Sequence, residues 1–307
     1  MILTASVALA SFITFAAIAA WGYVRESGSR RSRRLVFVVP LLAWFGVGLV
    51  LVATYWPRMR LSCAIRGGDL QTVQSLLSEH PEWLESKSID LDGDTPLGEA
   101  VMAGRQEVVA LLLKQGARTD PQVVTPPLVQ AAFYGRVEIG EMLLRHGANP
   151  DQTGLRDRNP AIELAAWFGH EAFVRLLLAH GVDLDAGDMD GDTALMSASE
   201  RGHERVVDLL LGHGADVSLS NRFGCTALHK AAAGGYESIV VALLAHGADV
   251  NASDYRGTAI HVAVTKGHAG VVRLLIRSHA DLTTAPPLSR VRDQETRQVL
   301  KEAGAER

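Results

Sequence analysis

Two series of regularly spaced glycines constrain the fold of this chain more than any other feature. Both series advance in steps of 31, 34, 33, 33 and 32 residues, and each glycine follows a short segment with apolar residues at helical spacing. Glycine ends a helix readily because it adopts the left-handed conformation without steric cost. Two short helices in each period predict a solenoid of stacked repeats. The two series are Gly104, Gly135, Gly169, Gly202, Gly235 and Gly267, and Gly116, Gly147, Gly181, Gly214 and Gly247 with His279 in the sixth place.

Residues 224–252 show the repeating unit most completely. Thr226 is suited to cap the first helix of the unit, and the leucine and alanines that follow it form a small apolar face. Gly235 ends this helix, a second and more apolar helix runs up to Gly247, and Asp249 then favours a turn. The small residues of the first helix predict that the two helices pack closely together.

At these positions the sequence resembles the ankyrin repeat family. The matching motifs are TPL at Thr95–Leu97, TALH at Thr226–His229, TAIH at Thr258–His261 and HGAD at His246–Asp249. The resemblance covers about residues 61–305. It implies an all-α ankyrin-repeat solenoid of about six full repeats with capping half-repeats. It also implies a protein partner that is bound on the concave surface.

Two repeats depart from the family's motif. In the second repeat Val124 stands in place of the turn glycine and Pro126 in place of the capping threonine, and in the third repeat Arg158 and Pro160 do the same. We expect the hairpin turns of these two repeats to be reshaped.

The N-terminal residues predict a membrane anchor. Residues 2–24 carry no charge, and residues 35–56 form a second uncharged run. Each run is long enough to cross about 30 Å of hydrocarbon as a helix. A secretory signal peptide would begin with basic residues, which the first run lacks. The sequence therefore predicts a two-helix transmembrane hairpin in residues 1–60, followed by an ankyrin domain in residues 61–307.

An arginine-rich loop between the predicted spans suggests their topology. The loop holds Arg25, Arg30, Arg31, Arg33 and Arg34. Positively charged loops remain in the cytoplasm, so both ends of the hairpin would face the other side. With 25 arginines against five lysines, the composition suggests a bacterium with a GC-rich genome. We therefore expect an inner-membrane protein with a periplasmic ankyrin domain, and a cytoplasmic domain is the alternative because three more arginines follow the second span.

The charge of the repeats argues against a nucleic-acid partner. Residues 1–60 carry seven arginines and one glutamate, so the rest of the chain has 23 basic and 33 acidic residues and a net charge of −10. A nucleic-acid-binding domain carries the opposite sign on its surface.

Residues that could bind metal or catalyse a reaction have a simpler explanation in the repeat. Ten of the eleven histidines occupy recurring positions, where equivalent residues lie about one helix layer apart, too far to share a metal ion. The aspartates of the acidic run at 183–192 belong to turns, and the run has no glutamate at the last position of a calcium loop. We expect no metal, no cofactor and no catalytic residues, and hence no enzyme.

Four aromatic residues are the candidate binding site. Two positions just before the first-helix glycine are exposed in the ankyrin family, and in the second and third repeats they hold Phe133, Tyr134, Trp167 and Phe168. Aromatic residues dominate the binding energy of many protein interfaces. The alternative is that some of these rings pack into the core between the helices.

The sequence thus predicts a membrane-tethered protein–protein interaction module that uses its concave ankyrin surface. An inhibitor or immunity-type binder is one form of this function. The alternative function is a regulatory or accessory subunit of a membrane channel or transporter, assembled through the hairpin in the lipid bilayer.

Overall fold

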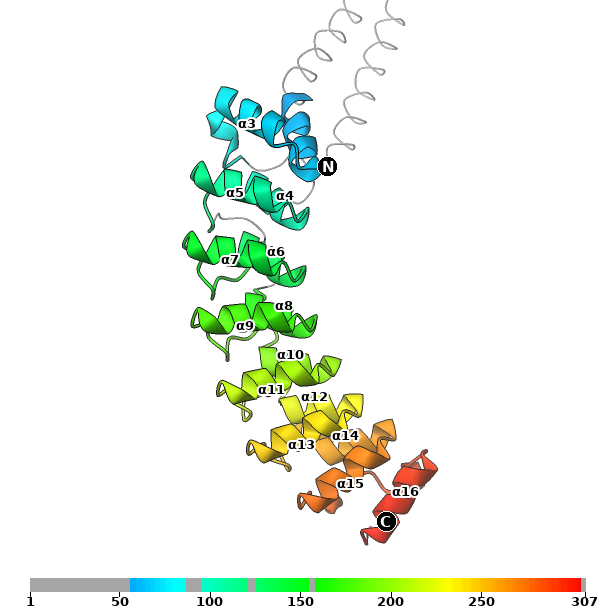
Figure 1. Ribbon diagram of the computed structural model, residues 1–307. Coiled ribbons are helices and arrows are strands. Elements are labelled where there is room, and N and C mark those ends of the chain that lie inside the picture. Colours follow the sequence, from blue (N-terminus) through cyan, green and yellow to red (C-terminus); the bar gives the residue numbers. More distant parts are fainter. Residues whose placement is uncertain (1–55, 87–94, 121–124, 155–157, 305–307) are drawn as a thin grey trace, which may run out of the picture.

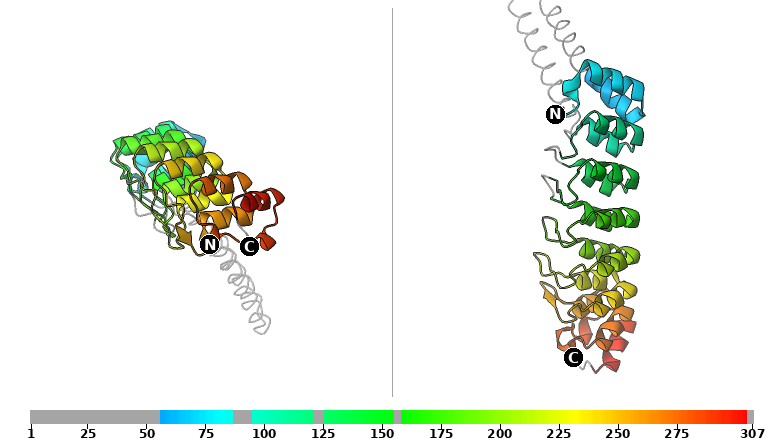
Figure 2. Two further views of the ribbon diagram at one scale, coloured as in Figure 1. Left: turned by 90° about the horizontal axis from the view of Figure 1, so that it is seen from below. Right: turned by 60° about the vertical axis from the view of Figure 1, so that its left-hand side comes forward.

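The glycine period appears in the structure as a stack of helix pairs. A computed structural model describes residues 56–86, 95–120, 125–154 and 158–304. These residues form one curved stack in which two rows of helices run side by side (Figure 1). The connecting segments project to one side of the stack (Figure 2).

The two rows correspond to the two helices of each repeat. We call the first helix of a repeat the inner helix and the second the outer helix. The inner helices are α4 (Pro96–Met102), α6 (Pro127–Phe133), α8 (Ala161–Trp167), α10 (Ala194–Arg201), α12 (Ala227–Gly234) and α14 (Ala259–Lys266). The outer helices are α5 (Gln106–Lys114), α7 (Val137–Arg145), α9 (Glu171–Ala179), α11 (Glu204–Gly212), α13 (Glu237–Ala245) and α15 (Ala269–Arg277).

The inner helices begin and end where the sequence predicts. Thr95 and Thr193 cap α4 and α10, because each hydroxyl oxygen accepts a hydrogen bond from a backbone N–H of the first turn. Gly235 follows α12 with a left-handed φ of 76°. In the described part of the chain two non-glycine residues have a left-handed φ, Arg158 with φ 50° and His279 with φ 64°. Both stand where other repeats have glycine, so their backbone is strained.

The core lies between the two rows and between neighbouring repeats. One alanine of each inner helix and one leucine of each outer helix are completely buried at equivalent positions. The alanines let neighbouring inner helices approach closely, and each buried leucine contributes about 2 kcal/mol of hydrophobic stabilisation. These residues are Ala100, Ala131, Ala165, Ala198, Ala231 and Ala263, and Leu112, Leu143, Leu177, Leu210, Leu243 and Leu275.

A ladder of hydrogen bonds joins the segments that follow the outer helices. The backbone N–H of Asp183 donates to Asp151 at 2.8 Å, and the N–H of Asp216 donates to Asp185 at 3.0 Å. Further along, β1 (Ser253–Asp254) and β2 (Gly257–Thr258) form a short antiparallel hairpin. The acidic residues of these turns therefore serve the backbone of the next repeat.

Further helices close both ends of the described stack; α16 is polar, whereas the N-terminal end leaves Trp56 and Met59 exposed. At the N-terminal end lie the helical residues 56–67 and α3 (Leu70–Glu79), with the 3-10 turn η1 (Pro81–Trp83) after it. At the other end η2 (Leu282–Thr284) and η3 (Leu288–Arg290) lead into α16 (Gln294–Glu302). The ends of a solenoid need a polar outer face because no further repeat covers them.

The prediction of a membrane hairpin ahead of the solenoid is corrected. No helix in the described part of the chain is long and apolar enough to cross a membrane. Helices with both ends described have seven to ten residues, whereas a span needs about 20. The predicted spans 2–24 and 35–56 lie outside the described residues, except for Trp56, and so does the whole arginine-rich loop. The expected location, an integral membrane protein with a periplasmic ankyrin domain, is corrected as well. The all-helical repeat fold is the part of the prediction that the structure retains.

Candidate functional site

Three aromatic side chains gather on the surface of the second and third repeats. Phe133, Tyr134 and Phe168 are 43%, 44% and 39% exposed. The ring of Phe133 lies 4.9 Å from that of Tyr134 and 4.7 Å from that of Phe168, in both cases edge to face. We call these three residues the aromatic cluster. Edge-to-face contacts are the favourable arrangement for aromatic rings.

The ends of two neighbouring inner helices position the cluster. Phe133 is the last residue of α6, Tyr134 is its C-cap, and Phe168 is the C-cap of α8. Buried alanines precede them in both helices and hold the two helix ends close together. Phe168 therefore meets Phe133 across a repeat boundary, although the two residues are more than 30 positions apart in the sequence.

Trp167 is set apart from the other three predicted residues. Among the described residues it makes no ring contact with the cluster, and it is more buried than the three cluster residues. Its ring lies instead under the guanidinium of Arg201, 4.9 Å away. This is a cation–π contact. Arg201 occupies the position of Phe168 one repeat further on, and the stacking of the two repeats places it beside Trp167.

His170 contacts two residues of the aromatic cluster, and this role was not predicted from the sequence. Its ring stacks on Phe168 at 6.0 Å, and its Nε2 donates to the carbonyl oxygen of Phe133 at 3.1 Å. His203 makes the same bond to Trp167 at 3.0 Å. In the third, fourth and sixth repeats the histidine directly after the first-helix glycine thus bonds to the repeat before it, and its recurrence in the sequence was a signal for this role.

Gly135 is required for this link. Its φ is +63°, and a Cβ atom built on it would lie 2.8 Å from Nδ1 of His170. A side chain at this position would displace the histidine that holds the cluster.

The other histidines also hydrogen-bond within the repeat framework. His146, His180 and His213 each donate from Nδ1 to the carbonyl oxygen four residues earlier, at 2.8 to 3.0 Å. His229 accepts from the backbone N–H of Thr226 and donates from Nε2 to a carbonyl oxygen of the next repeat. Burial lowers the pKa of His229. No group of three or more metal-ligating side chains occurs in the part of the chain that the structure describes.

Glu163 is a buried carboxyl group whose pKa is strongly perturbed. It occupies in α8 the place that His229 has in α12, but Pro160 stands where a threonine would bond to it. Glu163 is only 4% exposed, and its Oε1 accepts from Oγ of Ser197 at 2.5 Å. Its Oε2 has no hydrogen-bond partner among the described residues. Burial raises the pKa of Glu163 to about 7.

An ion-pair network lies beside Glu163. Nζ of Lys230 is 2.9 Å from Asp192 and 2.6 Å from Glu200. The amide of Asn221 also donates to Asp192, at 2.7 Å. These charges are mutually satisfied and connect the fourth repeat to the fifth.

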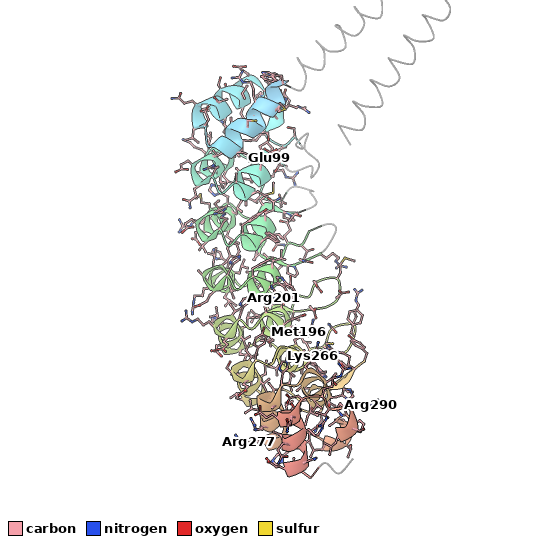
Figure 3. The ribbon with its side chains drawn as sticks, turned by 90° about the vertical axis from the view of Figure 1, so that its right-hand side faces the viewer. Glu99, Met196, Arg201, Lys266, Arg277 and Arg290 are labelled. Atoms are coloured by element: carbon pink, nitrogen blue, oxygen red, sulfur yellow. The ribbon has the colours of Figure 1, made fainter. Side chains whose placement is uncertain are left out.

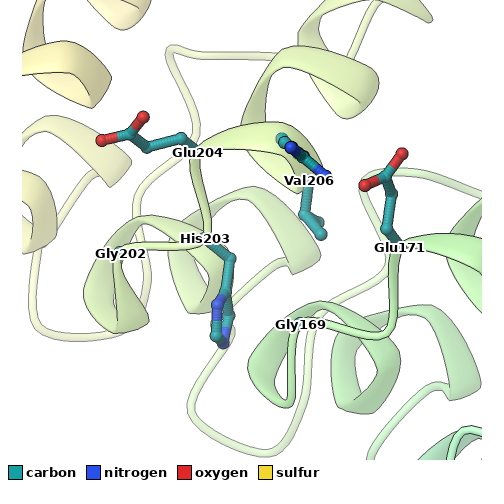
Figure 4. A pocket seen from close by; sticks show the side chains of 7 residues that line it. Gly169, Glu171, Gly202, His203, Glu204 and Val206 are labelled. Carbon is teal, nitrogen blue, oxygen red and sulfur yellow. The ribbon is translucent and has the colours of Figure 1, made fainter.

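One cavity of about 370 Å³ opens between the third and fourth repeats. Glu171 and Glu204 flank it on opposite sides of Val206 (Figure 4). Glu171 is already bonded to Arg175 at 2.7 Å, and His203 to a carbonyl oxygen. None of the seven lining residues offers a hydroxyl, thiol or amine nucleophile.

Cys225 is not a candidate nucleophile. It is buried, and its thiol donates to Oδ2 of Asp254 at 2.8 Å. Burial and the neighbouring carboxylate raise the pKa of the Cys225 thiol to about 11. At neutral pH the thiol stays protonated and unreactive.

A second exposed apolar group lies on the hairpin tips of the later repeats. Met189, Phe223 and Tyr255 are each at least half-exposed, and the two rings are 6.1 Å apart. The N–H of Tyr255 donates to the carbonyl oxygen of Phe223 at 3.3 Å, which joins the two tips. These residues were not predicted from the sequence, although Phe223 and Tyr255 stand at the same distance before the threonines that precede α12 and α14.

The fold and its surface define a class of protein. The described chain is a helical-repeat solenoid whose distinctive side chains lie on an open face, as expected of a binding module and not of an enzyme with an enclosed site.

Comparison with known proteins identifies the family within this class. A family model of ankyrin repeats, comprising three copies, matches residues 59–154, 128–221 and 213–285. The matches together span well over half of the chain, so the chain belongs to the ankyrin repeat family. No curated protein matches it. Ankyrin repeats are protein–protein interaction modules and are generally not enzymes.

Proposed function

We propose that this protein binds a partner protein through the aromatic cluster, with Trp167 at its margin. The supporting observation is that Phe133, Tyr134 and Phe168 stay about two-fifths exposed while contacting one another across two repeats. A contiguous group of exposed rings is typical of an interaction site, whereas exposed apolar residues that occur singly are ordinary.

The cluster is held rigidly before any partner arrives. His170 bonds to the carbonyl oxygen of Phe133 and stacks on Phe168, and both helix ends rest on buried alanines. A preordered surface loses little conformational entropy on binding, so more of the contact energy appears as affinity. Large aromatic side chains at the centre of an interface often contribute 2 kcal/mol or more each.

The consequence of binding depends on the partner. An inhibitor or immunity-type role follows if the partner is an enzyme or toxin whose working surface the repeats cover. The alternative role as a channel or transporter subunit depended on the membrane hairpin and is not carried further.

The test is affinity capture with the whole chain as bait. Baits are the wild type, the Phe133→Ala/Phe168→Ala variant, and Phe223→Ala as a matched change of an exposed ring elsewhere. The captured partner should be lost with the double variant and retained with Phe223→Ala. A partner retained by the double variant, or lost only with Phe223→Ala, would move the binding site away from the cluster.

A further inference from the structure

Two arginines lie on either side of the aromatic cluster. Arg136 follows Tyr134 by two residues, and its guanidinium packs against Gly104, 2.9 Å from where a Cβ of that glycine would lie. Arg201 covers the ring of Trp167 on the other side. Figure 3 shows Arg201 between Glu99 and Lys266 along the inner helices.

The nearby carboxylates do not neutralise these arginines. Arg136 and Arg201 form no ion pair with any residue that the structure describes. Glu200, the sequence neighbour of Arg201, is bonded to Lys230 at 2.6 Å, and Glu171 is bonded to Arg175 at 2.7 Å. Two exposed guanidinium groups therefore remain available beside the rings.

We propose that the partner presents an acidic polypeptide segment, with an apolar side chain for the cluster and carboxylates for Arg136 and Arg201. This inference rests on the proposed function, because the cluster must be the binding site for the arginines to matter. Guanidinium groups bind carboxylates through paired, charge-assisted hydrogen bonds. The surface thus combines an apolar anchor with charge complementarity.

The spacing of the arginines sets the length of the segment. Arg136 rests on the end of α4 and Arg201 on the end of α8, which are two helix layers apart. At about 10 Å per layer the guanidinium groups lie on the order of 20 Å apart. An extended chain covers that distance with about six residues. The recognised segment should therefore have two acidic positions about six residues apart, with aromatic or aliphatic residues between them.

The net charge of the repeats does not attract an acidic segment at long range. Residues 61–307 carry a net charge of −10, which repels an acidic partner at long range. At physiological ionic strength such repulsion is screened beyond about 8 Å, so direct contacts with the two arginines determine whether the acidic segment binds. Single-stranded nucleic acid also binds to rings and arginines, but it needs a positively charged groove along its backbone. The net negative charge of the repeats therefore argues against single-stranded nucleic acid as the ligand.

The experiment uses a library of random 12-residue peptides displayed on phage and selected against the whole chain. Selected peptides are then synthesised, and their affinities are measured for three variants. These are Arg136→Gln/Arg201→Gln, Phe133→Ala/Phe168→Ala, and Arg277→Gln/Arg290→Gln. The last pair removes the same charge from exposed arginines near the C-terminal end of the stack (Figure 3).

We expect selected peptides to carry acidic residues on both sides of an apolar one. Their affinity should fall about tenfold with Arg136→Gln/Arg201→Gln and stay unchanged with Arg277→Gln/Arg290→Gln. Added salt should weaken binding to the wild type more than to the first variant. Exposed arginines are replaced, so the folded state should be kept, and circular dichroism checks this.

Three outcomes would overturn the inference. Peptides without acidic residues that still depend on Phe133 and Phe168 would leave the proposed function standing and refute only the acidic partner. Peptides unaffected by both the arginine and the phenylalanine changes would refute the two together. Displacement of the selected peptides by a single-stranded oligonucleotide at lower concentration than by free acidic peptide would replace the polypeptide with a nucleic acid.

Discussion

Replacing Glu163 by glutamine should stabilise the protein, and only at neutral and alkaline pH. The carboxyl group is buried in α8, accepts one hydrogen bond from Ser197 and leaves Oε2 without a described partner. Burial is the main cause of its raised pKa, and the carboxylates of Asp188 and Asp192 add to it. The hydrogen bond from Ser197 and the charge of Lys230 act in the opposite direction.

The magnitude follows from the difference between the folded and unfolded pKa. The pKa of Glu163 is raised from 4.5 to about 7. Each unit corresponds to about 1.4 kcal/mol, so ionising the buried group costs on the order of 3 kcal/mol of folding free energy. The folded state holds the proton more tightly, so this cost is absent below pH 4.5. It grows as the pH rises from 4.5 to 7 and is complete above that window.

The variant Glu163→Gln removes the ionisation and keeps an oxygen that accepts from Ser197. Its free energy of unfolding should match the wild type below pH 4.5 and exceed it by about 3 kcal/mol above pH 7. Urea unfolding followed by far-ultraviolet circular dichroism measures both. Other titrating groups, such as His229, affect wild type and variant alike, so the difference isolates Glu163.

Exposed Glu138 provides the control. Glu138→Gln on the surface of α7 should change stability by less than about 0.5 kcal/mol at either pH. If Glu163→Gln changed stability equally at acid and alkaline pH, or destabilised the protein above pH 7, the argument from burial would be wrong.

Three further predictions concern packing and metal. Phe168→Ala should lower the free energy of unfolding by less than about 1 kcal/mol, whereas Phe173→Ala should lower it by about 3 to 5 kcal/mol because Phe173 is fully buried. Equal losses in urea melts would contradict the exposure of the cluster. Gly135→Ala should lower the free energy of unfolding by about 1 to 2 kcal/mol in the same assay, because the φ of residue 135 is +63° and the added methyl group meets His170. Unchanged stability would show that Gly135 and His170 do not approach each other closely. A chelator should leave the melting temperature unchanged, because the turn aspartates accept backbone hydrogen bonds, and a marked fall would reveal a bound metal.

The two exposed apolar groups of the molecule lie on different kinds of structure. The aromatic cluster lies on helix ends and contacts His170, so its shape depends on regular secondary structure. Phe223 and Tyr255 lie on turns, which are joined by a backbone hydrogen bond, a ring contact and the hydrogen bond from Cys225 to Asp254. Helix ends are less prone to local opening than turns, and this is a further reason to propose recognition at the aromatic cluster.

The repeat architecture was predictable because its signals are local. A threonine that caps α10 and the glycine that ends it act within one turn of helix, so Thr193 and Gly202 mark the boundaries wherever they occur. The effect of the motif departures was harder to predict: we expected reshaped turns, yet Arg158 in place of a turn glycine keeps a left-handed φ of 50°. Apolar run length was a less secure signal, and it led to the membrane hairpin that is corrected above.

The exposed aromatic positions could be predicted from the motif, but their grouping could not. Register placed Phe133, Tyr134, Trp167 and Phe168 on one face, yet only tertiary packing brought three rings together and set Trp167 under Arg201. The contacts of Phe133 with Phe168 and of Trp167 with Arg201 join residues more than 30 positions apart, where no local rule of sequence applies.

Side chains that act across a repeat boundary were decided by the tertiary structure alone. His170 is one of several histidines in equivalent positions, and only the neighbouring helix end gives it a carbonyl oxygen to bond and a ring to support. Glu163 resembles any helical glutamate until the next repeat covers it and Ser197 meets it. The sequence by itself determined the repeating unit, because each helix begins and ends through contacts within a few residues. The stacking of units determined which side chains are buried, paired or left exposed, because those properties depend on the residue that the next repeat happens to place opposite.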